Sequence, residues 1–163
     1  MIEPQTTINW SNTFQIWANV ATIINSIVVV ISLIYLARQV KISTKATKGA
    51  TYQTIINGVA SIEARISQDK EVARIFKVGA GDPAELDSIE KVIFHELISS
   101  YFNFYENLHF QADQDLVDKG LWKGWSKNLI DDLQKPGIAA WWDAKKDFYS
   151  DRFRKYVETE RDR

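Results

Sequence analysis

The chain has 163 residues, 25% of them charged, with 20 Lys and Arg against 21 Asp and Glu and no Cys. This length is that of one folded domain. The lack of Cys excludes disulfides and Cys-ligated metal or iron–sulfur sites, and the net charge of −1 argues against a nucleic-acid-binding surface. The 12% aromatic content argues against low-complexity disorder.

An uncharged apolar stretch, residues 18–37, is the main feature of the N-terminal part. As a helix, its twenty residues rise about 30 Å, which matches the hydrocarbon thickness of a bilayer. Trp10 and Trp17 precede it and Tyr35 lies near its end, as is typical of membrane interfaces. We predict a transmembrane helix over 18–37 after a short extracytoplasmic segment, 1–17. A buried helix of a soluble protein is the alternative.

Four basic residues follow this stretch with no acidic residue before Glu63: Arg38, Lys41, Lys45 and Lys48. On the other side lies Glu3 with no Lys or Arg, which disfavours a cleaved signal peptide. The charge asymmetry predicts that the N-terminus is outside and the C-terminal part cytoplasmic. The basic connector, residues 38–50, is either a topology signal alone or also a contact to anionic lipid headgroups.

Small and polar residues gather on one face of the predicted span, and this face includes Ala18, Thr22, Asn25, Ser26 and Ser32. Such stripes let membrane helices approach closely, and an amide inside the bilayer needs a hydrogen-bond partner. We therefore expect association with a second copy or another membrane protein. Alternatively, the hydroxyls bond their own helix and the amide reaches water.

Residues 51–163 are predicted to be a cytoplasmic all-α domain, a bundle of about four to six helices. Apolar spacing indicates an amphipathic helix that starts near Thr44, and nothing decides whether it continues from the span. The further expected helices cover 70–78, 87–111, 121–134, 138–148 and 151–158. Loops are expected from Gly79 to Pro83 and at Pro136–Gly137.

The expected helix 87–111 begins with a capping residue, Asp87, and has a broad apolar face. The centre of that face is predicted to be Ile89, Ile93, Leu97, Tyr101, Phe104 and Leu108. The opposite strip holds His95, Glu106 and His109, and we expect it to be a solvated surface. The Glu106-x-x-His109 spacing also suits a metal ion, although a dimetal site needs this motif twice.

Four tryptophans near the C-terminus allow two interpretations: Trp122, Trp125, Trp141 and Trp142. They form the core against which short helices fold, or they line an aromatic groove for a peptide or lipid-like ligand. No catalytic residues are assigned, since phosphate-loop and nucleophile-elbow motifs are missing from the sequence.

Several landmarks occur in a familiar order: Ala37-Arg38-Gln39-Val40-Lys41, Tyr52-Gln53, Phe104-Tyr105-Glu106-Asn107, Gly120-Leu121-Trp122, Pro136-Gly137 and Trp141-Trp142. With these, the chain resembles a widespread group of uncharacterised bacterial single-pass membrane proteins with a cytoplasmic helical domain. The resemblance implies the topology and a bacterial inner-membrane location. It carries no activity.

These observations favour a non-enzymatic, membrane-anchored accessory or interaction subunit, without a cofactor. It would associate through its span and present the helical domain to a cytoplasmic partner. The alternative is a small-ligand or metal-binding helical sensor that uses the strip of His95, Glu106 and His109 or the aromatic groove.

Overall fold

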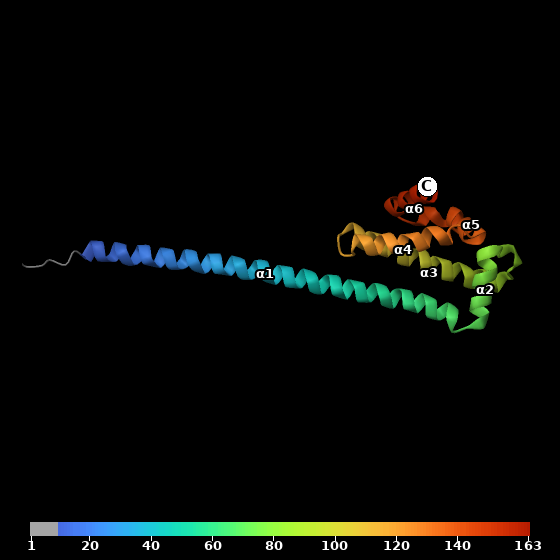
Figure 1. Cartoon of the computed structure of the whole chain (residues 1–163), viewed down its shortest axis with the longest axis horizontal. Coiled ribbons are helices and arrows are strands. Elements are labelled where there is room, and N and C mark those ends of the chain that lie inside the picture. The colour runs from blue at the N-terminus through green and yellow to red at the C-terminus, as the bar shows by residue number, and fades with distance from the viewer. Residues whose placement is uncertain (1–9) are drawn as a thin grey trace, which may run out of the picture. The chain divides into compact units, whose positions relative to one another are not determined.

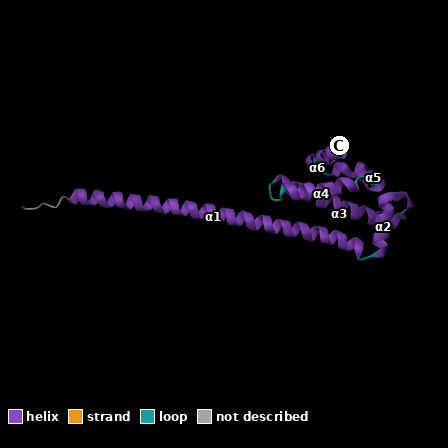
Figure 2. Ribbon diagram, in the orientation of Figure 1, coloured by secondary structure: helices purple, strands orange, loops and turns teal. Residues whose placement is uncertain are grey.

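The computed structural model describes residues 10–163, which are 89% helical and contain no strand (Figures 1 and 2). Residues 1–9 of the predicted segment 1–17, Glu3 among them, lie outside the described residues. The elements are α1 (Trp10–Ser67), α2 (Lys70–Gly81), η1 (Pro83–Glu85), α3 (Ser88–Asp113), α4 (Lys119–Asp132), α5 (Pro136–Lys145), η2 (Lys146–Phe148) and α6 (Asp151–Arg161). The all-α prediction is confirmed.

The described residues divide into two compact units, and the boundary between Ala46 and Thr47 falls inside α1. Among the described residues, one helix is long and apolar enough to cross a membrane, and it is α1. All its residues from Phe14 to Ala50 are exposed. Helical structure continues to Ser67, so no break separates the apolar stretch from the amphipathic one.

Short side chains fix the helix starts in the second unit. Asp87 accepts hydrogen bonds from the backbone of Ile89 and Glu90, and Glu90 caps in return, so the predicted capping box is confirmed. Comparable N-caps begin α2, η1, α4 and α6: Asp69, Asp82, Asp118 and Ser150. Each satisfies backbone N–H groups that have no partner within the helix.

The buried face of α3 differs from the expected one. Ile89 is 71% exposed, whereas Phe102 is fully buried. The buried residues of α3 are Phe94, Leu97, Ile98, Phe102, Tyr105, Leu108 and His109. Because α2, α4, α5 and α6 all contact α3, the helix buries more than one face, and its core face is turned toward the strip expected to be solvated.

Two glycines let α2 and α5 approach at backbone distance. A Cβ on Gly137 would lie 1.8 Å from the Gly79 carbonyl oxygen, and a Cβ on Gly79 would lie 2.5 Å from the Phe94 ring. The loop expected from Gly79 to Pro83 is shorter in the structure, since α2 continues to Gly81 and only Asp82 separates it from η1. The break expected at Pro136–Gly137 is instead the first turn of α5, where Pro136 is favourable.

Candidate functional site

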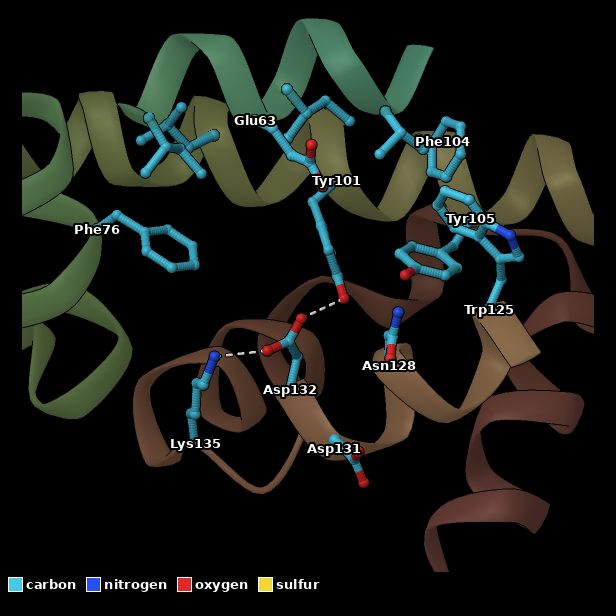
Figure 3. Close-up of a pocket in the computed structure, with 14 residues that line it drawn as sticks. Glu63, Phe76, Tyr101, Phe104, Tyr105, Trp125, Asn128, Asp131, Asp132 and Lys135 are labelled. Atoms are coloured by element: carbon cyan, nitrogen blue, oxygen red, sulfur yellow. Dashed lines mark hydrogen bonds and ion pairs between the residues drawn. The ribbon is translucent and has the colours of Figure 1, made fainter. Parts of the chain in front are cut away.

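A cavity of about 360 Å³ lies between α1, α3 and α4 within the second unit. Its apolar wall consists of Val59, Ile62, Ile66, Phe76, Leu97, Phe104 and Trp125. Figure 3 shows that Tyr101 and Tyr105 reach into it from α3, opposite Asn128 and Asp132 of α4. Its size is within the range of ligand pockets, about 300–1,000 Å³.

A hydrogen-bonded chain crosses the polar side of this cavity (Figure 3). The Tyr101 hydroxyl donates to an oxygen of Asp132, and the Lys135 ammonium donates to the other oxygen at 2.5 Å. The same ammonium lies 5.7 Å from the centre of the Phe76 ring. Asp132 is thus paired on both oxygens, which offsets its partial burial.

Both tyrosine hydroxyls in the cavity stay protonated near neutral pH. Burial, followed by the proximity of Tyr105 and Asp132, raises the pKa of Tyr101 far above its usual value. Burial raises the pKa of Tyr105 to about 12, with a smaller contribution from negative charge on Asp132 and Glu63. They therefore act as hydrogen-bond donors, and this suits binding better than proton transfer.

The strip with both histidines is engaged in helix packing. The His95 Nδ1 accepts a hydrogen bond from Trp141 Nε1 at 2.9 Å, and Glu106 Oε1 accepts one from the Ser150 backbone N–H at 2.7 Å. These contacts tie α3 to α5 and to the start of α6. In residues 10–163 no group of three or more His, Asp or Glu side chains is placed to hold a metal ion.

His109 corrects the prediction of a solvated strip, since it is only 8% exposed. Its ring packs among three aromatic rings, with centroid separations of 5.3 Å to Trp122, 5.7 Å to Phe153 and 5.0 Å to Tyr156. Burial lowers the pKa of His109, because the charged imidazolium would lose water contacts there. The covering helix is α6, whose Phe153 and Tyr156 pack on this face, and the periodicity of α3 alone does not reveal such a neighbour.

The four tryptophans occupy different places. Trp142 is fully buried in the core, and Trp141 stacks on Phe102 with ring centroids 5.3 Å apart. Trp122 packs on His109, whereas Trp125 lines the cavity described above. The structure therefore does not bring the four predicted groove residues together, and Trp125 is the one that reaches the cavity in Figure 3.

The polar stripe of the apolar segment is partly satisfied within its own helix. The hydroxyls of Thr22 and Ser26 donate to the carbonyls of Ala18 and Thr22 at 2.9 Å, and Ser32 donates to Val28 at 2.8 Å. The structure gives the Asn25 amide no hydrogen bond with any described residue. Asn25 is thus the member of the stripe that still needs a partner.

The basic connector is exposed throughout. Arg38, Lys41, Lys45 and Lys48 all lie on the surface of α1, and none of them forms an ion pair with another residue of the described range. Four free cations within eleven residues leave this segment strongly positive.

The cavity itself was not predicted. The sequence pattern places Tyr101 in the core and gives no role to Asp132 or Lys135. Tyr101 and Asp132 are 31 positions apart, on different helices, so helical periodicity cannot relate them. In the sequence, the site shows only as Asp132 and Lys135, an acidic and a basic residue three positions apart near a helix end. Such pairs are common on exposed helix surfaces, so they do not indicate a cavity.

Comparisons with protein families, with curated proteins and with solved structures found no match. The resemblance to bacterial single-pass membrane proteins therefore stays a prediction.

Proposed function

We propose that the chain is a non-enzymatic, membrane-anchored interaction protein in which residues 18–37 cross the bilayer. The observation that carries this proposal is the exposure of the apolar segment: Ile27, Val28 and Ile31 are each more than half exposed. Exposed apolar area costs roughly 25 cal/mol per Å² in water, and contiguous patches of this length are rare on soluble monomers. A lipid environment removes that cost.

The proposed orientation places the N-terminus outside and residues 47–163 in the cytoplasm of a bacterium. The unpaired cations Arg38, Lys41, Lys45 and Lys48 support it, since positive charge is retained on the cytoplasmic side. The same cations would hold the start of the helical domain near anionic lipids, at about 1 kcal/mol each.

The lack of Cys makes topology directly testable. Asn12→Cys and Thr159→Cys each place one thiol at an exposed position, on opposite sides of the segment. In intact spheroplasts, a membrane-impermeant maleimide should label Asn12→Cys, whereas Thr159→Cys should react only after lysis. Labelling of both variants in intact cells would overturn the proposed topology.

The proposed association depends on Asn25. Asn25→Leu should reduce the mass of the complex extracted in mild detergent. The substitution removes the hydrogen bond that the Asn25 amide is proposed to form with a neighbouring span. Ile34→Leu is the control, since it introduces the same side chain on the opposite side of the helix, about 180° from Asn25 at 100° per residue. Equal complex masses for wild type and both variants would contradict a role of Asn25 in association.

A second candidate function, a small-ligand sensor, is favoured by the α1/α3/α4 cavity. Here an apolar wall meets convergent hydrogen-bonding groups, as in ligand sites generally. The helical domain would then report ligand binding to a membrane partner. Its test is whether any small aromatic ligand binds the full chain at this cavity.

A further inference from the structure

We propose that the α1/α3/α4 cavity binds a small organic cation, an ammonium group attached to an aromatic or compact apolar body. This inference rests on the second candidate function above and assigns the ligand class of its site.

Carboxylates outnumber ammonium groups around the cavity. Three carboxylates line it, on Glu63, Asp131 and Asp132, against one ammonium, on Lys135. Lys135 pairs with Asp132, whereas Glu63 has no ion pair with any residue in 10–163. Figure 3 shows Glu63 beside Tyr101, with the Asp131 side chain turned away from the centre of the cavity. These four side chains give the lining a formal net charge of −2, which favours a cation over an anion.

Aromatic side chains make up much of the cavity lining. Rings of Phe76, Tyr101, Phe104, Tyr105 and Trp125 surround the cavity. The centroids of Tyr101 and Tyr105 lie 4.7 Å apart, and those of Phe104 and Trp125 lie 5.9 Å apart. The negative faces of such rings attract cations, and aromatic cages are a common way to bind quaternary ammonium groups.

An ammonium group of the protein already lies at one edge of this cavity. Lys135 Nζ is 2.5 Å from Asp132 Oδ1 and 5.7 Å from the centre of the Phe76 ring. This geometry combines a carboxylate contact with an aromatic face, the same chemistry that the proposed ligand needs. A ligand ammonium near Tyr101 would therefore compete with Lys135 for Asp132.

Binding should be measured on the full chain in nanodiscs of zwitterionic lipid, by saturation-transfer NMR titration with empty nanodiscs subtracted. Three probes share one aromatic ring and differ in charge: benzyltrimethylammonium, benzyl alcohol and phenylacetate. The expected result is a Kd for benzyltrimethylammonium about tenfold lower than for either of the others, since local charge favours the cation and opposes the anion.

Two substitutions in the cavity lining and one control outside it localise the effect. Glu63→Gln removes an exposed, unpaired carboxylate and should weaken cation binding about threefold. The matched control Glu85→Gln removes an exposed carboxylate that does not line the cavity, and it should leave the Kd unchanged. Lys135→Met removes the competing ammonium and should strengthen cation binding, whereas a merely structural role of Lys135 would weaken it.

The outcomes separate the two proposals. Equal affinity for all three probes, or weaker cation binding in Lys135→Met, would overturn the cation inference and leave the sensor function standing. If no probe binds at any charge, both the sensor function and this inference fall, and the membrane-anchored interaction protein is unaffected.

Discussion

Isoleucines at 23–34 and isoleucines of the helical domain lie in opposite environments. In the apolar part of α1, Ile23, Ile27 and Ile31 are between 53% and 60% exposed, whereas Ile75 and Ile98 are 1% exposed. The first set has no protein surface against it, and the second is enclosed by other helices. Apolar side chains of this chain are therefore shielded from water in two ways: by protein packing in the helical domain and, as proposed, by lipid along the apolar part of α1.

The strongest test concerns the proposed burial of the apolar part of α1 in lipid. Ile27→Arg combined with Ile31→Arg places two charges near the centre of the proposed span, at a cost of about 5–7 kcal/mol for insertion. We expect the doubly substituted chain to leave the membrane fraction after an alkaline wash. The free energy of unfolding of residues 47–163 should stay unchanged.

Ile89→Arg combined with Val92→Arg is the matched control. These residues are also exposed, 71% and 60%, but they lie in the helical domain. Because water surrounds them, the substitutions should change stability by less than about 1 kcal/mol and leave membrane binding intact. Retention of the Ile27/Ile31 variant in the membrane would show that this segment is not the anchor.

The next test concerns protein packing in the helical domain, at the contact between α2 and α5. Gly137→Ala would place a methyl group against the Gly79 carbonyl, a backbone atom that cannot move aside. We expect a loss of about 3 kcal/mol in the free energy of unfolding, since overpacking forces α2 and α5 apart. Urea unfolding followed by far-UV circular dichroism measures it.

Gly124→Ala is the control for Gly137→Ala, and it should change the free energy of unfolding by a smaller amount in the opposite direction. Nothing lies within 4 Å of a Cβ at Gly124, which is inside α4. Alanine there should raise the free energy of unfolding by about 0.5–1 kcal/mol through helix propensity. Loss of stability in both variants would contradict a specific close contact at Gly137.

The smallest effect concerns the buried His109. Its pKa is lowered by burial, so the unfolded chain binds more protons once the pH falls through the ordinary histidine value of about 6.5. The free energy of unfolding should therefore decrease from pH 7.5 to 5.5. Nearby charges on Asp113 and Glu106 oppose this shift, whereas Arg152 adds to it.

His109→Leu isolates this contribution from the carboxylates that titrate in the same chain. Leucine suits the apolar surroundings formed by Trp122, Phe153 and Tyr156. Between pH 7.5 and 5.5, wild type should lose more stability than the variant. Identical losses would mean that His109 titrates in the fold as it does in the unfolded chain.

Local features of the fold followed from the sequence. The apolar stretch 18–37, the capping box at Asp87 and the all-α class rest on spacings of a few residues, which act within one helix turn or one element. For the same reason the sequence determined which segments are helical and which are apolar enough for a membrane.

Only the tertiary structure decided which faces of those helices are covered. The burial of His109, the contact of Gly79 with Gly137 and the cavity at Tyr101 and Asp132 each join residues from different helices. Helical periodicity gives the faces of one helix but not the neighbours that pack on them. Because α3 is contacted by four other helices, its polar strip became partly core, and the candidate site formed where α1 leaves space beside it.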